Sequence, residues 1–461
     1  MSEQVSMPQE PYAGYRQPHR VVEDAELTHV GPNTPCGEYL RRFWQPVCMT
    51  EQLTDLPLAL TIMGENLVVF RDKSGQIGLL NRHCSHRGAS LEFGIISDRG
   101  IRCCYHGWLF DVDGRILETP GEPPRSPLKD GFVHGAYPTH EYKGLVFAYM
   151  GPPGTKPDFP VYDSLELPDN EMVPYAIHYP CNWLQVNENP VDPYHSVFLH
   201  SRVTEAHFNV SWGALPVVEW HVKEGGTGVH LTNTRRWKDH LWTRINEWVA
   251  PNFAQTPDIY QNPDHEKFFV RAGLSKWAVP VDDTNTMIIA WRHFNDDLDV
   301  DGKSDRSEIG LNKVDFLGQT SARSYEEGQR IPGDYEAQVG QGPINIHALG
   351  NLGYTDTGVA LVRRTLREGI RAVQEGRDLP LLAPAASGHV PTQCCDVVVR
   401  VGEMSDNREI QGEIGRAIGR IAVETEELSY IERRTEIEKR VRAYLAERRQ
   451  AAENTGREHD D

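Results

Sequence analysis

Two short motifs that each pair a cysteine with a histidine constrain this chain more than any other sequence feature. They are Cys84-Ser-His86 and Cys103-Cys-Tyr-His106, and residues 87–102 separate them. Each motif offers one thiolate and one imidazole on a tight loop, so the two loops can close on one small inorganic centre. The set suits a 2Fe–2S cluster with two cysteines on one iron and two histidines on the other, or a tetrahedral zinc ion. The spacing to His106 favours Cys103 over Cys104 as the second thiolate.

The charge balance limits the possible partners. The chain has 461 residues, and 47 Lys+Arg against 66 Asp+Glu give a net charge of −19. Nucleic acids and anionic membranes need basic surfaces, so neither is expected as a main partner. No apolar run approaches the ~18 residues of a spanning helix, and the polar N-terminus lacks the apolar middle of a signal peptide. We therefore expect a cytoplasmic protein, whose eight cysteines are free thiols or metal ligands rather than disulfides.

The distribution of turn residues predicts an α+β protein of two main domains. Between residues 57 and 150, short strand-like runs alternate with Gly and Asp turns, which is typical of a small antiparallel barrel or sandwich. Further along, strand-like segments over 215–295 lie between helical patterns, which are found at 183–205, 358–376 and 408–452. We expect four regions: an N-terminal arm (1–45), an antiparallel β domain (46–155), a larger domain with an antiparallel sheet flanked by helices (156–400), and a C-terminal helical extension (401–461).

A second constellation places two histidines five positions apart, in Asn189-Pro-Val-Asp192-Pro-Tyr-His195-Ser-Val-Phe-Leu-His200. Two histidines and one carboxylate on one face of a metal are the ligands of non-haem Fe(II) oxygenases. On a straight α-helix, five steps of about 100° turn the second imidazole about 140° away from the first. We therefore expect a wide turn or π-bulge between His195 and His200. Asp192 is near enough along the chain to hold the His195 imidazole in the right tautomer.

Taken together, these motifs resemble those of Rieske non-haem iron oxygenase alpha subunits. Cys84-Ser-His86-Arg-Gly88 and Cys103-Cys-Tyr-His106-Gly-Trp108 are similar to the Rieske signature, C-x-H-R-G then C-x-x-H-G-W. The segment from Asn189 to His200 is similar to the family's iron motif, N-x-x-D-x-x-H-x-x-x-x-H. The resemblance favours the branch that contains phthalate dioxygenase and aryl O-demethylases. The chain departs from the pattern at Cys104, where the family usually has proline.

The resemblance implies two metal centres. One Rieske 2Fe–2S cluster would be held by Cys84, His86, Cys103 and His106. One mononuclear Fe(II) would be held by His195, His200 and a later carboxylate. The segment Gly333-Asp334-Tyr-Glu-Ala-Gln338 matches the acidic segment of the phthalate-dioxygenase-like branch, which makes Asp334 that ligand and leaves Glu336 as the reserve candidate. Asn189 and Asp192 are the further catalytic residues that the motif implies.

The same resemblance implies the terminal oxygenase of a system that uses O2 and electrons from NAD(P)H. No G-x-G-x-x-G stands between a strand and a helix, so a separate reductase, with or without a ferredoxin, would deliver the electrons. We expect monooxygenation, by O-demethylation or hydroxylation, of an aromatic substrate that is carboxylated or methoxylated. The alternatives are cis-dihydroxylation and a Rieske electron-transfer protein without oxygenase activity. The candidates for binding a substrate carboxylate are Arg235, Arg236, Arg244 and Arg292.

In this family the cluster of one subunit serves the iron of its neighbour in a head-to-tail ring. We therefore expect a homotrimer or a multiple of three. Asp192 matches the residue that links the two centres, and it would accept hydrogen bonds from His195 and from a Rieske histidine, His86 or His106, across the interface. The alternative role for Asp192 is to cap the turn that follows it.

Overall fold

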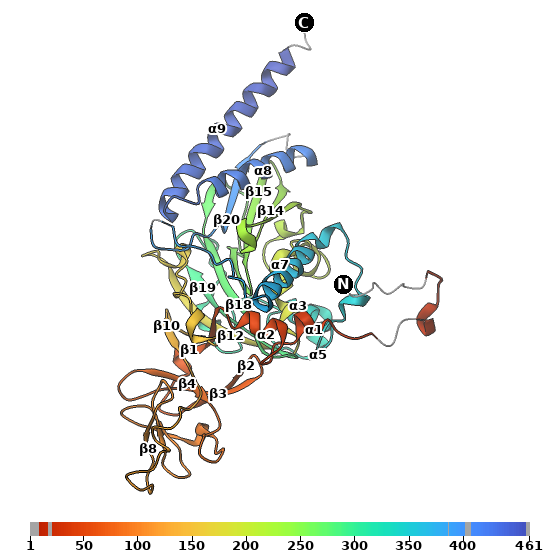
Figure 1. Ribbon diagram of the computed structural model, residues 1–461. Helices are drawn as coiled ribbons and strands as arrows, with labels where there is room; N and C mark the ends of the chain where they lie inside the picture. Colours follow the sequence, from red (N-terminus) through yellow and green to blue (C-terminus); the bar gives the residue numbers. More distant parts are fainter. Residues whose placement is uncertain (1–8, 17–20, 386, 402–406, 458–461) are drawn as a thin grey trace.

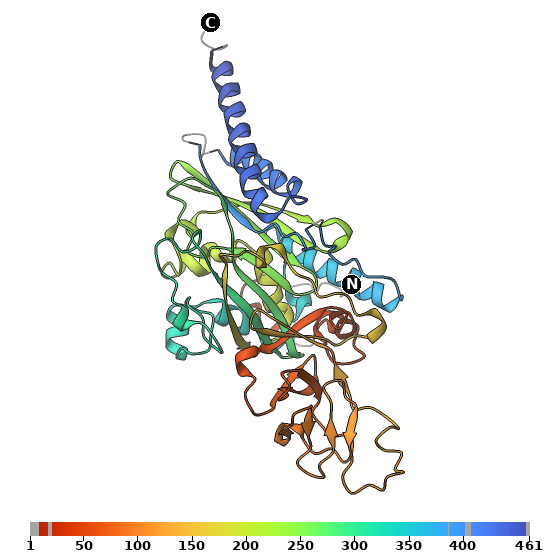
Figure 2. The same cartoon turned by 90° about the vertical axis from the view of Figure 1, so that its left-hand side faces the viewer.

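A small β-rich lobe and a larger body built on one sheet make up the computed structural model of the protein (Figure 1). It describes residues 9–16, 21–385, 387–401 and 407–457. Parts of the expected N-terminal arm and C-terminal extension lie outside these residues. The small lobe lies at one end of the molecule, and the C-terminal helix projects from the opposite end (Figures 1 and 2).

The small lobe consists of short antiparallel strands in three sheets, with the orders β1-β11-β10, β2-β3-β4-β9 and β5-β6-β7-β8. Glycines with positive φ close the tight turns between them, as at Gly75 (φ 92°) and Gly114 (φ 83°). The strands are β1 (Trp44–Met49), β2 (Leu58–Ile62), β3 (Glu65–Arg71), β4 (Ile77–Asn81), β5 (Ile95–Ile96), β6 (Ile101–Arg102), β7 (Leu109–Phe110), β8 (Ile116–Glu118), β9 (Ala136–Tyr137), β10 (Thr139–Tyr142) and β11 (Leu145–Tyr149).

The larger body is organised around an antiparallel sheet of the order β12-β19-β18-β16-β15-β14-β13, in which β20 also pairs with β15 and β17. Its central strands are long, and most of their side chains are buried on both faces of the sheet. Apolar residues such as Trp, Ile and Val are therefore frequent in them. The strands are β12 (Glu171–Tyr179), β13 (Val217–Val222), β14 (Gly228–Trp237), β15 (His240–Val249), β16 (Phe253–Pro257), β17 (Lys267–Val270), β18 (Ala272–Asp282), β19 (Asn285–Phe294) and β20 (Cys395–Arg400).

Helices cover both faces of this sheet. Some begin at a side-chain cap; for example, the Asn182 side chain accepts the Leu184 N–H at the start of α3. The helices are α1 (Ala25–Thr28), α2 (Pro35–Leu40), α3 (Trp183–Glu188), α4 (His195–Val197), α5 (Tyr325–Arg330), α6 (Asp334–Val339), α7 (Thr357–Gln374), α8 (Arg408–Glu424) and α9 (Tyr430–Arg457).

Helix α8, the first of the two helices in the C-terminal extension, packs directly against β13, β14 and β15. Its glycines allow this close approach, because a Cβ at Gly415 would lie 2.2 Å from the Thr234 hydroxyl and one at Gly419 would lie 2.6 Å from the Thr232 hydroxyl. Ile414 and Ile418 of α8 are fully buried in one core with Val441 of α9. Helix α8 and the first half of α9, up to Leu445, are therefore part of the core of the larger body, and the rest of α9 projects from it (Figure 1).

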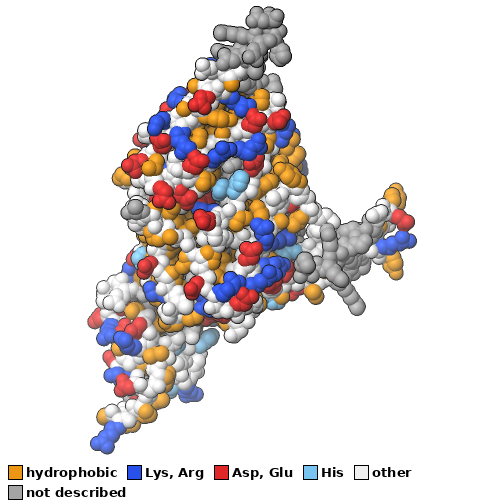
Figure 3. Space-filling model, turned by 45° about the horizontal axis from the view of Figure 1, so that its top comes forward, with side chains coloured by type: hydrophobic (Ala, Val, Ile, Leu, Met, Phe, Trp, Pro, Cys, Tyr) orange, Lys and Arg blue, Asp and Glu red, His pale blue; other side chains and the backbone are white. Residues whose placement is uncertain are grey.

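The α+β class and the antiparallel arrangement in both regions are confirmed. The helical pattern at 408–452 forms two helices rather than one, because residues 425–429 interrupt it. The expected domain boundaries stay predictions. None of the described helices is both long and apolar enough to cross a membrane. Basic and acidic side chains intermingle on the face shown in Figure 3.

Candidate active site

The two Cys/His motifs form a pair of equivalent loops in the small lobe. In the first, the Gly88 N–H donates to the Cys84 carbonyl (2.8 Å) and the Cys84 N–H donates to the Ala89 carbonyl (2.9 Å). In the second, the Gly107 N–H donates to the Cys103 carbonyl (3.0 Å) and the Cys103 N–H donates to the Trp108 carbonyl (2.8 Å). Each loop turns at a glycine of left-handed conformation, with φ of 75° and 73° respectively. The backbone thus makes Cys103, not Cys104, the counterpart of Cys84.

The donor atoms of these loops fit a 2Fe–2S cluster. The Cys84 and Cys103 side chains are both buried, whereas Cys104 is exposed. The His86 and His106 rings lie 4.6 Å apart, and the His86 ring also stacks on Trp108. Among the described residues, the buried Nδ1 atom of His86 has no hydrogen-bond partner. Burial raises the pKa of the Cys84 thiol to about 11, so the thiolate needs a nearby positive charge of the kind that a metal supplies.

The two histidines of the second motif are brought together by a π-helical turn at Phe198–Arg202. Its i→i+5 hydrogen bond runs from the Val203 N–H to the Phe198 carbonyl (2.9 Å). His195 begins α4 just before this turn, and His200 lies within it. The wide turn compensates for the five-residue spacing, and the sequence-based expectation of a π-bulge is confirmed.

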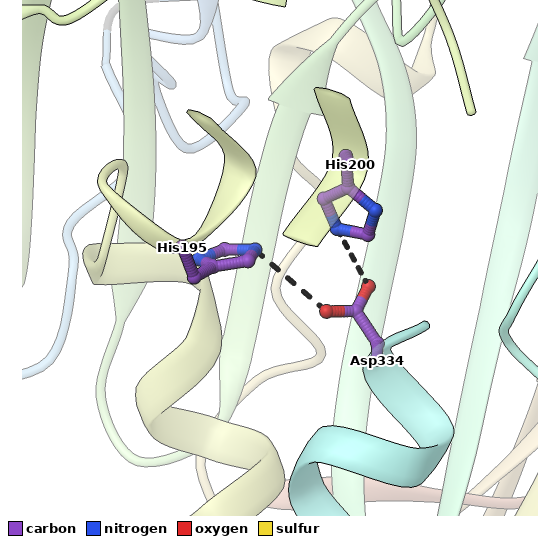
Figure 4. Close-up of side chains that lie close together, drawn as sticks. All are labelled: His195, His200 and Asp334. Atoms are coloured by element: carbon purple, nitrogen blue, oxygen red, sulfur yellow. Dashed lines mark ion pairs between the residues drawn. The ribbon is translucent and has the colours of Figure 1, made fainter. Parts of the chain in front are cut away.

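Asp334, the first residue of α6, completes a cluster with these histidines (Figure 4). The Asp334 Oδ1 atom lies 3.7 Å from His195 Nε2, and Oδ2 lies 3.4 Å from His200 Nε2. One ligand atom from each of the three residues lies within 4.8 Å of the others, and among the described residues this is the one such group that could hold a metal ion. Two imidazoles and a carboxylate on one side suit a non-haem iron with open positions opposite.

The cluster has the protonation states that metal binding requires. Burial would raise the pKa of the Asp334 carboxyl, but the adjacent His200 and His195 hold it far below its usual range. Burial lowers the pKa of His195 despite the opposing effect of Asp192 and Asp334. An ionised Asp334 carboxylate beside a neutral His195 imidazole meets the protonation requirement of metal ligands.

Two amide side chains orient Asp334. The Asn189 Nδ2 donates to Asp334 Oδ1 (3.0 Å), and the Gln319 Nε2 donates to Oδ2 (2.7 Å). The reserve candidate Glu336 is turned away, because it pairs with Arg323 and accepts the Gly333 N–H (2.8 Å). The structure therefore brings Asn189 and Asp334 to the two histidines and does not bring Glu336 there.

Asp192 lies at the edge of this cluster and is partly exposed. Its Oδ1 atom accepts the Tyr194 N–H (2.9 Å) and the His195 N–H (3.3 Å), which caps the turn. The other carboxylate oxygen, Oδ2, lies 3.7 Å from His195 Nδ1. The capping role is observed within one chain, and it leaves Oδ2 for a further contact.

A cavity of about 90 Å³ adjoins the cluster. Apolar walls come from Ile177, Leu231, Ile259, Leu274, Ile288 and Phe316. Charged and polar groups also reach it, among them Lys276 of β18 and Arg235 of β14. The arrangement provides an apolar chamber, with a few polar groups, directly beside the three candidate ligands.

Comparisons with known proteins agree with this geometry. The model of the Rieske [2Fe-2S] domain matches residues 43–139. The tert-butanol monooxygenase / tert-amyl alcohol desaturase oxygenase subunit of Aquincola tertiaricarbonis is 41% identical, over 93% of this chain and 95% of the relative. The alpha subunit of phenoxybenzoate dioxygenase from Ectopseudomonas oleovorans is 39% identical, over 77% of this chain and 86% of the relative.

The chain belongs to the Rieske non-haem iron oxygenases, as an oxygenase subunit. This oxygenase also shares its fold with dicamba monooxygenase bound to dicamba, at a TM-score of 0.54 and 17% identity over 73% of this chain and 99% of the other. The oxygenase is an oxidoreductase with one Rieske 2Fe–2S cluster and one mononuclear non-haem iron.

The cluster loops allow a direct test of which thiol binds. Replacing Cys104 of the oxygenase with serine is expected to leave the visible and electron paramagnetic resonance spectra of the cluster unchanged, because the Cys104 side chain is exposed whereas that of Cys103 is buried. The matched change Cys103→Ser is expected to bleach the protein. Bleaching by the Cys104 change alone would move the ligand by one residue.

Sequence reasoning missed one residue of the iron site, His207. The His207 Nδ1 atom lies 3.0 Å from His200 Nδ1, and the backbone N–H of His207 donates to the backbone carbonyl of His200 (3.0 Å). Burial, reinforced by His200, lowers the pKa of His207 to about 4, so its ring is neutral and its Nδ1 can accept. With His207 accepting at Nδ1, His200 presents Nε2 toward Asp334. The seven-residue separation in sequence gave no signal of this pairing.

We expect His207→Ala to weaken iron binding by about 10- to 100-fold, as is usual when a ligand histidine loses its orienting partner. The measurement is iron content after dialysis against a graded chelator, with the cluster spectrum as an internal reference. His221→Ala, which removes a half-exposed histidine of β13, is the matched control. Equal iron retention in both variants would show that His207 does not orient His200.

Proposed function

We propose that Cys84, His86, Cys103 and His106 hold the Rieske cluster, and that His195, His200 and Asp334 hold the mononuclear iron. The observation that carries the second assignment is the convergence of three ligand atoms within 4.8 Å beside a cavity. The equivalent backbone of the two cysteine loops supports the first. Bound at these residues, the cluster supplies single electrons and the iron activates O2 beside the substrate.

The residues of the chain control that chemistry in distinct ways. Asn189 and Gln319 fix both oxygens of Asp334, so the carboxylate keeps one orientation toward the histidines. The apolar cavity walls exclude water from the side where the substrate lies. Asp192 holds the His195 backbone through one oxygen and offers the other to a histidine of an adjoining subunit.

We propose a head-to-tail homotrimer, or a multiple of three, that receives electrons from NAD(P)H through a separate reductase, with or without a ferredoxin. The partial exposure of Asp192 supports this arrangement, because a contact from another chain can reach its free oxygen. Two relatives are named as the oxygenase subunits of dioxygenases, which also supports electron delivery by a separate protein.

For the substrate, we propose an aromatic carboxylate that is hydroxylated or O-demethylated. Lys276 carries this proposal. It lines the cavity, and among the described residues no hydrogen bond or ion pair to its ammonium group is found. Arg244, by contrast, is neutralised by a double contact with Asp396, and Arg292 pairs with Asp315. Burial lowers the pKa of Lys276, and the candidate iron ligand Asp334 opposes this effect. An anionic substrate would add a further negative charge that stabilises the ammonium form.

Arg235 adds to this excess of positive charge. Its side chain is buried, and in the described parts of the chain its hydrogen bonds go to neutral groups, including the Ser196 hydroxyl (3.0 Å) and the Pro193 carbonyl (3.3 Å). Burial and the neighbouring Arg244 lower its pKa to about 9, and its Nε atom has no partner among the described residues. Arg235 and Lys276 thus both reach the cavity without a carboxylate of their own.

The cavity volume favours a second candidate, which is a small branched alcohol. About 90 Å³ is less than the ~150 Å³ of an engineered cavity that accepts benzene. One relative is named for tert-butanol and tert-amyl alcohol, which are compact molecules of this kind. In this reading Lys276 would bind a hydroxyl oxygen instead of a carboxylate.

One experiment separates the two candidates. With a reductase and NADH, 3-methoxybenzoate, anisole and tert-butanol are offered separately, and products are identified by mass spectrometry. The aromatic carboxylate proposal expects demethylation of 3-methoxybenzoate over anisole. Turnover of tert-butanol alone would support the second candidate, and no turnover of any neutral or anionic compound in a wider panel would contradict both.

Lys276→Met tests the charge directly. The KM for an aromatic carboxylate is expected to rise about tenfold or more, because one charged hydrogen bond is lost, while the KM for a neutral substrate changes little. Lys439→Met, on an exposed position of α9, removes the same charge elsewhere and is the control. An equal change of KM for both substrates would show that Lys276 does not recognise a carboxylate.

A further inference from the structure

The larger sheet has a second cavity on the face opposite the active site. Neighbouring residues of a strand point to opposite faces. On β18, Lys276 lines the active-site cavity and Trp277 lines the second cavity. On β15, Asn246 lines the active-site cavity and Val249 lines the second cavity. The sheet itself therefore separates the two spaces.

This second cavity has the size and lining of a small-molecule site. Its volume is about 350 Å³, several times that of the active-site cavity. Sites for small molecules are typically a few hundred Å³ and lined by apolar and aromatic groups. Rings dominate the walls here, from Trp44, Phe147, Phe159, Phe253, Trp277 and Trp291.

The rings are already arranged around the space in contact with one another. Phe253 stacks on Tyr162 with ring centroids 4.4 Å apart, and the Trp277 ring packs against Phe253 at the same centroid distance, 4.4 Å. Trp277 also meets Phe147 edge to face at 5.4 Å. These mutual contacts hold the walls in place, so a flat molecule could enter without rebuilding them.

Two polar groups in this apolar wall are unpaired. Tyr162 and Trp277 are 7% and 6% exposed. Among the described residues, no hydrogen bond is found for the Tyr162 hydroxyl or for the Trp277 indole N–H. Buried Tyr and Trp side chains usually find a partner for these groups. Other polar groups nearby are satisfied, since the Trp44 N–H donates to the Pro157 carbonyl (3.0 Å) and the Trp291 N–H donates to the Lys143 carbonyl (2.8 Å).

We propose that this cavity is a second binding site, for a neutral two-ring aromatic molecule that carries one hydrogen-bond acceptor such as a carbonyl oxygen. The rings would lie among the aromatic walls, and the acceptor would receive a hydrogen bond from Tyr162 or from Trp277. No charged side chain with a buried head group lines the cavity among the described residues, which distinguishes it from the active-site cavity.

Occupancy of this site would connect separate parts of the molecule. Trp44 of β1 and Phe147 of β11 belong to the small lobe, whereas Trp277 and Trp291 belong to the central sheet. Further walls come from residues 157–162 and 380–384, together with Gly388 and Val390. A bound molecule would touch all of these elements at once and stabilise their packing.

Benzophenone is a suitable probe, because it has two rings, one carbonyl oxygen and no charge, and it cross-links to nearby C–H bonds when irradiated. We expect benzophenone to quench the tryptophan fluorescence of the holoenzyme in a saturable way. We also expect it to cross-link to residues 157–162 and 380–384. Tyr162→Phe combined with Trp277→Phe keeps an aromatic ring at each position and removes both donors, and it should weaken binding about tenfold or more. Leu382→Trp, which fills the cavity from the half-buried loop wall, should abolish the cross-links.

The cluster spectrum, iron content and melting temperature of each variant establish that it is folded. Unchanged affinity in the double variant, or unchanged cross-links in Leu382→Trp, would overturn the proposal. Cross-links confined to the segment 189–212 would place the probe in the active site instead. Absence of saturable binding to the wild-type holoenzyme would also refute the second site.

Discussion

Asp334→Ala is expected to remove the mononuclear iron and to lower turnover by about a thousandfold or more, while the spectrum of the Rieske cluster stays unchanged. The carboxylate is the ligand on which both histidines converge, at 3.7 and 3.4 Å, and without it two neutral imidazoles hold a divalent ion weakly. Iron content by elemental analysis, the visible spectrum and product formation measure the three effects separately. His195→Ala and His200→Ala should behave in the same way.

Glu336→Gln is the matched control, because it removes a carboxylate two residues away on the same helix. Glu336 is occupied by Arg323 and by the start of α6, so its loss should reduce stability slightly and leave the iron in place. Full iron content in Asp334→Ala together with iron loss in Glu336→Gln would transfer the third ligand to Glu336.

Asp192→Asn is expected to leave both metal centres loaded and the cluster reducible, yet to lower turnover by about a hundredfold or more. Asparagine can still cap the turn through its carbonyl oxygen, so the local fold should survive. The lost charge is what would hold two imidazoles in register across a subunit boundary. Rapid mixing of reduced protein with substrate and O2, followed by the bleaching and return of the cluster colour, measures electron delivery directly.

Mixed rings of Asp192→Asn and His86→Ala chains test whether the path runs between subunits. Each variant alone should be inactive, but some interfaces of a mixed ring combine an intact cluster with an intact Asp192, so activity should return in part. Rings of Asp192→Asn and Asp334→Ala chains are the control, since both changes affect the same side of the interface. If mixed rings of verified mass stay inactive in both pairings, electrons travel within one chain.

The sequence predicts the local chemistry of this oxygenase better than its long-range contacts. Motif spacing is a local property, so the pairing of Cys84 with His86 and the wide turn before His200 could be predicted. The meeting of Asp334 with His195 rested on family resemblance, because nothing local relates residues 139 positions apart. The role of Lys276 was missed for a similar reason, since which face of β18 it occupies depends on strand pairing.

Helix boundaries also depend on long-range contacts that the local sequence does not show. Residues 408–452 have one continuous helical composition, yet the chain turns at 425–429. Leu428 is exposed there, whereas Ile414 and Ile418 are buried against the sheet. The position of the break follows from how α8 packs on β13 and β14. This packing depends on Gly415 and Gly419, which allow α8 to approach the sheet, and the sequence alone does not reveal that role.

The π-helical turn makes the iron site sensitive to the length of the chain. In a regular α-helix, residues four apart point the same way, whereas residues five apart diverge. The extra residue between His195 and His200 is thus accommodated only because the turn at Phe198–Arg202 is one residue wider than an α-turn. A single insertion in this segment would swing His200 out of the cavity even if every ligand remained in the sequence. Among related chains, gaps should therefore be rarer between these two histidines than substitutions.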